Sequence, residues 1–271
     1  MTFNSKKQLS QFLAEDVGKG DITSNLLPKK RILVKIISRE NAILAGVTYA
    51  KEIFKLKGCN CKILKKDGTK IKPNQTIMII TGNAGNILTC ERTALNLLTR
   101  MSGIATQTNS LVKKIPKKTK LYATRKTAPG LRYFDKEAVE IGGGEKHRLT
   151  LDEMVMIKDN HIAVGDSLSS LIKKTKKKYK KFEVEVENTA DAVLAAKEGA
   201  TIIMLDNFTP AQIKKTIQTL KNMKLRNKVM LEASGGITSK NISKYGQTGV
   251  DIISVGSITN SVKGIDMSLE I

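Results

Sequence analysis

The stretch FEVEVENTADAVLAAKEGATIIMLDNF, residues Phe182–Phe208, contains two short β-branched and apolar runs on either side of a helical segment. The runs Phe182–Val186 and Thr201–Leu205 predict strands, and this order favours two parallel strands joined by a crossover helix. The same alternation extends outward in both directions, with further runs at Leu121–Thr124, Met154–Ile157, Val229–Ala233 and Asp251–Val255. Six strands are fewer than the eight of a closed α/β barrel, so we expect an incomplete or atypical barrel.

The first hundred or so residues follow a different pattern. Strand-like apolar runs at Ile32–Ile37 and Thr76–Thr81 are separated by a helical segment from about Val47 to Leu56, which indicates a separate unit of α+β type. A long amphipathic helix then begins near Leu88 and is expected to bridge to the barrel domain.

The charge of the chain narrows the kinds of ligand that it attracts. Its 271 residues carry a formal net charge of +22, which would attract nucleic acid, an anionic membrane or small polyanionic substrates. Aromatic residues make up only 4% and tryptophan is absent, which disfavours a protein that stacks nucleic-acid bases. The lysine-rich run Lys173–Lys181 is interpreted as the solvated end of a helix, with adhesion to polyanions as the alternative.

Nothing in the sequence suggests export or membrane insertion. The opening residues lack the layout of a signal peptide, and no apolar run approaches the ~18 residues that a membrane span needs. A cytoplasmic location is therefore expected. Cys59 and Cys61 have no nearby histidine to complete a zinc set, and we expect both thiols and that of Cys90 to be reduced and structural.

Chemically distinctive residues stand at the carboxyl end of each predicted barrel strand. In chain order they are Arg125 and Lys126, Lys158 and Asp159, Glu185, Asp206 and Asn207, Ser234 with Gly235 and Gly236, and finally Gly256 with Ser257. In a barrel of parallel strands these positions converge on one mouth, where barrel enzymes keep their chemistry. The sequence therefore predicts a single active site at this mouth.

The charged members of this set indicate an anionic substrate. Five basic or imidazole groups face only two carboxylates, Glu185 and Asp206; the five are Arg125, Lys126, His147, Arg148 and Lys158. The two carboxylates would hold Mg²⁺, directly or through water, or stabilise positive charge on a sugar carbon. The alternative for Glu185 is a salt-bridged structural carboxylate, and because Glu183, Glu185 and Glu187 share one strand face, depth of burial must distinguish them.

The glycines and histidines are each interpreted as having one specific role. Gly235, Gly236 and Gly256 follow the last two strands, where glycine lets backbone N–H groups approach a phosphate, with ordinary turn glycines as the alternative. Neither histidine has a nucleophile beside it in the sequence. We interpret His147 as a substrate ligand that hydrogen-bonds and His161 as a structural partner of its own loop.

Nine motifs distributed along nearly the whole chain resemble the quinolinate phosphoribosyltransferase family. They are EDVGKGDITS, ERTALNLLTRMSGIAT, ATRKTAPGLR, GGGEKHR, IKDNH, EVEVEN, MLDNF, EASGGI and ISVGSIT. The resemblance implies an N-terminal α/β sandwich domain over residues 1–107, to which the tail 265–271 is expected to return. It further implies an open α/β barrel of six or seven strands over residues 108–264. A homodimer, with hexamers also known in the family, is implied as well.

The resemblance also implies roles for individual residues. Lys126, Lys158, Glu185 and Asp206 would be catalytic, and the last two would hold Mg²⁺. Arg92, in ERTALN, would be donated across the dimer interface to the substrate. The other substrate-binding residues would be Thr124, Arg125, Lys126, His147, Arg148, Lys158, Glu185, Asp206, Ser234, Gly235, Gly236, Val255, Gly256 and Ser257.

The implied reaction joins quinolinate to phosphoribosyl pyrophosphate and releases CO₂, giving nicotinate mononucleotide for NAD synthesis. Ala123 and Lys146 depart from the residues common in the family, although neither change removes a proposed ligand. Three alternatives remain: the molybdenum-transport-associated relative, disfavoured by the intact Lys158–His161 segment; a nicotinate or nicotinamide phosphoribosyltransferase; and a polyanion-binding protein on a degenerate scaffold.

Overall fold

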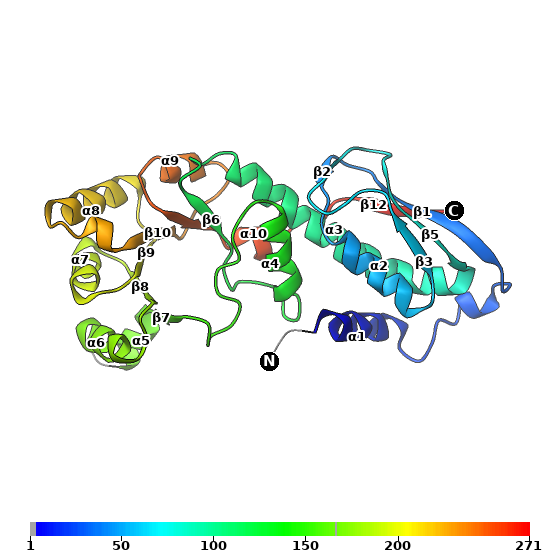
Figure 1. Cartoon of the computed structure of the whole chain (residues 1–271), viewed down its shortest axis with the longest axis horizontal. Coiled ribbons are helices and arrows are strands. Elements are labelled where there is room, and N and C mark those ends of the chain that lie inside the picture. Colours follow the sequence, from blue (N-terminus) through cyan, green and yellow to red (C-terminus); the bar gives the residue numbers. More distant parts are fainter. Residues whose placement is uncertain (1–3, 166) are drawn as a thin grey trace. The chain divides into compact units, whose positions relative to one another are not determined.

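The computed structural model describes residues 4–165 and 167–271 of the chain, which form two compact units (Figure 1). The first unit contains the described residues up to Asn109, with Ala128–Gly143 and Ser261–Ile271. The second contains Ser110–Thr127 and Gly144–Asn260, apart from residue 166. No helix in the described part of the chain is both long enough and apolar enough to cross a membrane.

The second unit is built on a six-stranded parallel sheet. Its strands, in the spatial order β6-β11-β10-β9-β8-β7, are β6 (Lys120–Tyr122), β11 (Ile252–Ser254), β10 (Met230–Ser234), β9 (Ile202–Asp206), β8 (Phe182–Val186) and β7 (Val155–Ile157). Because β6 and β7 are the two edge strands, the sheet is open, as predicted. An isolated parallel bridge from Tyr122 to Glu145 adds to the free edge of β6.

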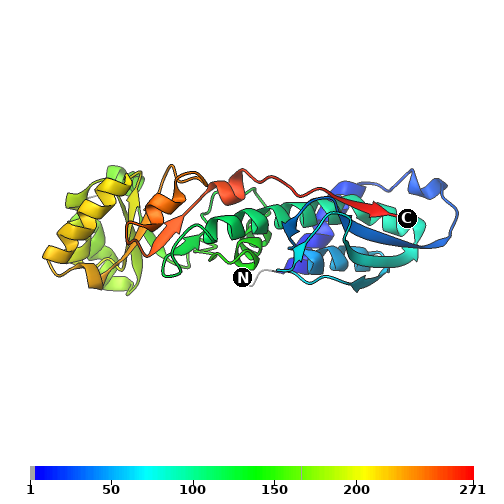
Figure 2. The same ribbon diagram turned by 90° about the horizontal axis from the view of Figure 1, so that it is seen from above.

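Helices between the strands lie along the outer side of this sheet (Figures 1 and 2). They are α5 (Asp159–Val164), α6 (Leu168–Lys178), α7 (Thr189–Glu198), α8 (Pro210–Asn222), the 3-10 turn η2 (Arg226–Lys228) and α9 (Ile242–Gly246). The short helix α10 (Ser257–Asn260) follows the last strand in the chain, β11. Local chemistry sets their starts: the Asn188 side chain accepts the Asp191 N–H at 2.9 Å, and Thr209 caps α8 directly before Pro210. The lysine run forms the exposed end of α6, as interpreted from the sequence.

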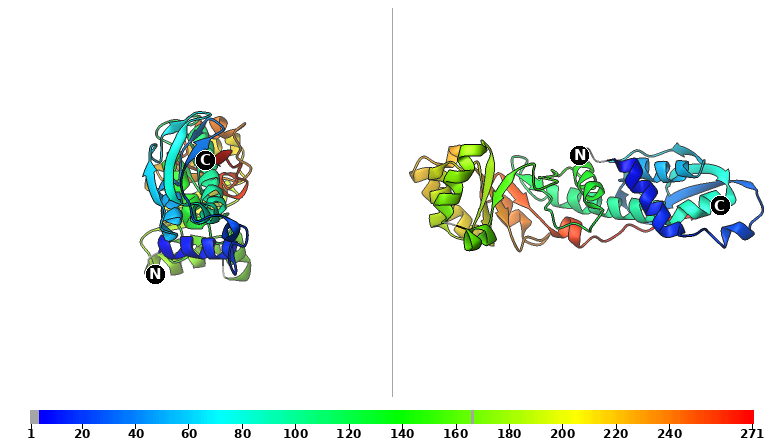
Figure 3. Two further views of the ribbon diagram at one scale, coloured as in Figure 1. Left: turned by 90° about the vertical axis from the view of Figure 1, so that its right-hand side faces the viewer. Right: turned by 90° about the horizontal axis from the view of Figure 1, so that it is seen from below.

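The first unit is a small antiparallel sheet covered by helices. The sheet order β12-β1-β5-β3 joins β12 (Met267–Glu270), β1 (Arg31–Ser38), β5 (Thr76–Asn83) and β3 (Asn60–Ile63), and β2 (Ala42–Ile43) pairs separately with β4 (Lys70–Ile71). Helix α2 (Val47–Leu56) packs on β3 and β5, and α1 (Ser5–Val17) packs on α2 as an outer layer (Figure 3). The 3-10 turn η1 (Ser24–Leu26) and the long helix α3 (Ala84–Val112) complete the chain up to the barrel strands. Cys59 and Cys90 are buried here and all three thiols are free.

Helix α4 (Arg132–Ile141) belongs to the first unit, whereas the sequence analysis included its residues in the barrel domain. The ring of Phe134 packs against Phe12 and Tyr49, with centroids 5.7 and 5.0 Å away. The buried carboxylate of Asp135 accepts two hydrogen bonds from Arg100, at 2.7 and 2.8 Å. These contacts with residues distant in the sequence determine where α4 packs, and no local pattern reveals them.

Candidate active site

A cavity of about 360 Å³ opens at the carboxyl ends of the barrel strands, and all of its lining residues belong to the second unit. Of the residues predicted to bind substrate, those that line it are Thr124, Arg125, Lys126, His147, Arg148, Lys158, Glu185, Asp206 and Ser234. It is completed by Ala123, Met156, Met204, Glu232 and Ser254. The strand ends therefore meet at one site, as the parallel-barrel argument requires.

Two arginines make one side of the cavity cationic. The Nε of Arg125, which follows β6, is buried and has no hydrogen-bond partner among the described residues. Arg148 donates from Nη1 to the Met154 carbonyl at 3.0 Å, and burial, with the nearby charge of Arg125, lowers the pKa of Arg148. Because a buried guanidinium nitrogen without a partner is costly, this side of the cavity is suited to an anionic ligand.

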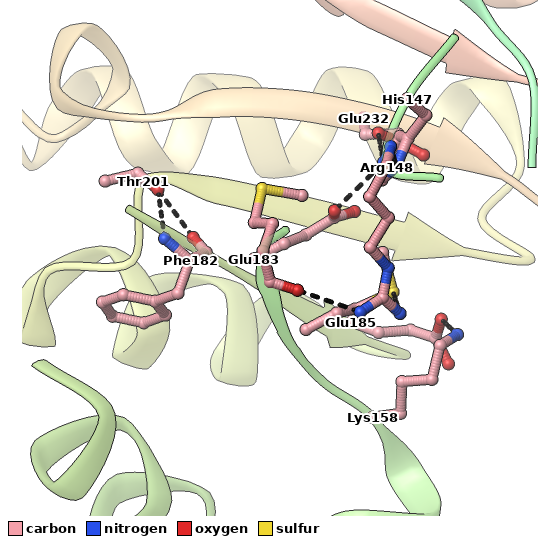
Figure 4. Close-up of polar contacts among 10 residues, drawn as sticks. His147, Arg148, Lys158, Phe182, Glu183, Glu185, Thr201 and Glu232 are labelled. Atoms are coloured by element: carbon pink, nitrogen blue, oxygen red, sulfur yellow. Dashed lines mark hydrogen bonds and ion pairs between the residues drawn. The ribbon is translucent and has the colours of Figure 1, made fainter. Parts of the chain in front are cut away.

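The carboxylates predicted to be catalytic follow β8 and β9, and the charge of Glu185 also acts on the Arg148 guanidinium. Lys158, at the end of β7, forms an ion pair with Glu185 of β8 (Figure 4). The Glu185 side chain is 12% exposed, and Asp206, at the end of the neighbouring strand β9, accepts the side-chain N–H of Asn207 at 2.7 Å. Glu185 is thus both salt-bridged and exposed to the cavity, so the two interpretations of this residue are compatible.

The predicted glycines lie beside the cavity rather than in its lining. Gly235 has φ +87°, and a Cβ on it would come within 2.2 Å of the Asn207 Oδ1 atom. Gly256 approaches the Lys126 side chain, where an added Cβ would lie 3.1 Å from Cδ. These glycines therefore allow the loops after β6, β9 and β10 to pack closely, and their contact with a phosphate stays a prediction, as do the roles of Val255 and Ser257.

Alanine at Gly235 is expected to raise the KM for phosphoribosyl pyrophosphate, the substrate that the resemblance implies, by roughly 10- to 100-fold, because the clash with Asn207 would displace the neighbouring Asp206. Steady-state kinetics at varied phosphoribosyl pyrophosphate measures this effect. Gly68→Ala is the matched control, since Gly68 has a similar φ of +83° but open space around its Cβ position. If both variants lost the same activity, backbone strain alone would explain the result.

The two histidines have different environments. The Lys158 N–H donates to His161 Nδ1 at 3.0 Å, which confirms His161 as a structural partner of its loop. His147 points into the barrel, where its Nε2 lies 3.2 Å from a Glu183 oxygen. Burial alone would lower the pKa of His147, but hydrogen bonds to Glu183 and Glu232 outweigh that effect and raise it to about 9. Whether His147 also contacts the substrate stays a prediction.

The sequence analysis assigned no role to Glu183 or Glu232, although both carboxylates are fully buried inside the barrel. A simple signal could have found them. Side chains two residues apart on a strand point to the same face, and each glutamate stands two residues before a predicted site residue, Glu185 on β8 and Ser234 on β10. Arg92, in contrast, is an exposed residue of α3 in the first unit.

The open parallel sheet and the cationic cavity at its strand ends define an α/β-barrel enzyme for anionic substrates. Family models for the N-terminal and C-terminal domains of quinolinate phosphoribosyl transferase match residues 21–102 and 104–270. The chain belongs to this family.

Proteins similar to this chain align with it over nearly their full lengths. A probable nicotinate-nucleotide pyrophosphorylase (carboxylating) from Archaeoglobus fulgidus is 44% identical over 255 residues, covering 93% of this chain and 98% of the relative. The Dictyostelium discoideum nicotinate-nucleotide pyrophosphorylase (carboxylating) is 34% identical, with 99% and 96% covered. The solved structure of the Francisella tularensis nicotinate-nucleotide pyrophosphorylase aligns with a TM-score of 0.91 and 40% identity, covering 98% of this chain and 95% of that one.

Proposed function

We propose that the chain transfers the phosphoribosyl group from phosphoribosyl pyrophosphate to quinolinate and releases pyrophosphate and CO₂. The product is nicotinate mononucleotide, a precursor of NAD. Family membership supports the reaction class, and the observation that carries the choice of substrate is the buried, partnerless guanidinium nitrogen of Arg125 in a cavity with several further cationic groups.

The acceptor is bound at the arginine side of the cavity. Quinolinate carries two adjacent carboxylates, and Arg125 and Arg148 offer planar forks that match carboxylate geometry. Lys126 and His147 line the same cavity and add positive charge or a hydrogen bond. A monocarboxylate such as nicotinate would leave part of this cationic wall without a partner, which favours the dicarboxylate.

The phosphoribosyl donor is bound at the carboxylate side. Glu185 and Asp206 stand at the ends of neighbouring strands and line one cavity, and carboxylate oxygens are the ligands that Mg²⁺ prefers. Glu185 and Asp206 would hold a Mg²⁺ ion, which when bound would neutralise negative charge on the leaving pyrophosphate. Ser234, with the glycines that follow it, is positioned to hold the 5-phosphate.

The reaction proceeds by substitution at the ribose. The pyridine nitrogen forms a bond to ribose C1 as the bond from C1 to the pyrophosphate oxygen breaks, and positive charge develops on the sugar. Glu185 and Asp206 stabilise that charge, while Lys158 stabilises the departing pyrophosphate. The bond between the ring and the 2-carboxylate then breaks, CO₂ leaves, and the ring carbon takes up a proton. The protein contributes mainly by positioning and electrostatics.

The second part of the proposal is that the active unit is a homodimer in which Arg92 enters the partner's site. Arg92 is exposed on α3, so its guanidinium is available to another subunit. If so, mixing Arg92→Ala with Arg125→Ala protein should restore about a quarter of wild-type activity, because half of the randomly formed dimers would keep one intact site. Activity that stays at the level of the separate variants would contradict a shared site.

The reaction itself is tested by following pyrophosphate release with quinolinate, nicotinate or nicotinamide as the acceptor. We expect release with quinolinate and Mg²⁺, and none above background with the other two. Release with nicotinate alone would preserve the fold assignment but overturn the substrate.

A further inference from the structure

Two fully buried glutamates face the same imidazole, that of His147 (Figure 4). Glu183 is on β8 and does not line the cavity, whereas Glu232, on β10, and His147 both line it. The Nε2 of His147 is 3.2 Å from Glu183 Oε2 and 3.6 Å from Glu232 Oε2. None of the four carboxylate oxygens has a hydrogen-bond partner of good geometry among the described residues, so the two glutamates contact His147 as ion-pair partners.

The orientation of the imidazole is determined on both sides. Its Nδ1 lies 2.7 Å from the backbone nitrogen of Arg148, and its Nε2 faces the two glutamates. Two carboxylates beside one imidazole favour a proton on Nε2, which points towards them.

His147 is held in an uncommon backbone conformation. Its φ is +53°, a region that residues other than glycine rarely occupy without support from the surrounding structure. On the preceding side, the Glu145 N–H donates to the Leu121 carbonyl at 2.8 Å, which attaches the segment to β6. On the following side, Arg148 donates to the Met154 carbonyl just before β7. The segment therefore runs from one edge strand towards the other, with His147 as its inward anchor.

We infer that Glu183 and Glu232 are positioning residues for recognition of the acceptor's carboxylates. Through His147 they fix the backbone from which the next residue, Arg148, presents its guanidinium to the cavity. This inference rests on the proposed function, in which Arg148 binds a carboxylate of quinolinate. Preorganisation of this kind matters because a displaced arginine must be reordered at the expense of binding energy.

The inference predicts an effect that is selective for one substrate. Glu183→Leu, which removes the acceptor at similar volume, should raise the KM and the dissociation constant for quinolinate about tenfold. The KM for phosphoribosyl pyrophosphate should change by less than about twofold, because Glu185, although it is on the same strand, is held by its own ion pair with Lys158 and not through His147. Glu232→Leu should have a smaller effect in the same direction, since its oxygen is farther from Nε2.

Three further variants separate positioning from general structural damage. Glu183→Gln should restore quinolinate binding to within about threefold of wild type, because the amide oxygen still accepts the Nε2 proton. Glu187→Leu is the matched control on the same strand face; Glu187 is exposed, and all parameters should be unchanged. In a His147→Ala background, Glu183→Leu should add less than about a twofold further change.

An unchanged quinolinate affinity in folded Glu183→Leu and Glu232→Leu proteins would overturn the inference. An equal loss of affinity for both substrates, or additive effects of the His147 and Glu183 changes, would also overturn it, since either result indicates a structural role alone. If Glu183→Leu does not fold, Glu232→Leu gives the same comparison. Wild-type protein that fails to convert quinolinate would instead overturn the proposed function, so the two failures are distinguishable.

Discussion

Arg125→Ala is expected to lower kcat/KM for quinolinate by roughly 100- to 1000-fold, the range found when one partner of a buried charge pair is truncated. The reason is geometric: the buried Nε of Arg125 lacks a partner, so a substrate carboxylate would supply the missing interaction. Steady-state kinetics with saturating phosphoribosyl pyrophosphate measures the loss. The free energy of unfolding should not decrease, because the change removes an unsatisfied buried group rather than a native contact.

Two variants accompany this measurement. Arg125→Lys keeps the charge but not the planar fork, so its activity should lie between those of wild type and Arg125→Ala. Arg31→Ala is the matched control, since Arg31 is exposed at the start of β1 in the first unit, and it should behave like wild type. An Arg125→Ala enzyme with near-wild-type kcat/KM would refute the proposed role.

Lys158→Ala should reduce kcat by about 100- to 1000-fold, comparable with the loss of a preorganised donor to developing negative charge. Lys158 is proposed to stabilise the departing pyrophosphate, and its removal also leaves the 12% exposed Glu185 without its counterion. Stopped-flow or steady-state measurement of pyrophosphate release gives kcat, and calorimetry gives quinolinate affinity separately. Quinolinate affinity should change little, since the substitution removes none of the proposed quinolinate ligands.

The control for this variant is Lys214→Ala, because Lys214 is exposed on α8. A Lys158→Ala protein that loses quinolinate affinity but retains kcat would contradict the proposal, because Lys158 would then bind quinolinate and not the departing pyrophosphate.

Much of the barrel could be predicted from the sequence, because buried parallel strands leave a strong local signal. The runs beginning at Leu121, Phe182 and Thr201 all lie on or next to observed strands, and the rule that parallel strand ends converge then predicts the cavity. The position of α4 could not be predicted, because it depends on Phe134 and Asp135 contacting residues far away in the chain.

The burial of the three glutamates on and just after β8 also could not be predicted from the sequence. Alternation places Glu183, Glu185 and Glu187 on one face, and the structure orders them from fully buried, through partly exposed, to exposed. Depth depends on how the neighbouring strands are staggered, which the local sequence does not encode. The two-residue spacing before Ser234 could have indicated Glu232 on β10, but its contact with His147 depends on the strand arrangement.

The central claim, that this chain is a decarboxylating quinolinate phosphoribosyltransferase, is tested most directly with quinolinate labelled with ¹³C in its 2-carboxylate. The labelled substrate is incubated with phosphoribosyl pyrophosphate and Mg²⁺, and labelled CO₂ and nicotinate mononucleotide are followed together by NMR. The account predicts that both appear at the same rate and in equal amounts, only when phosphoribosyl pyrophosphate is present. Label retained in the product, or no product at all, would contradict it.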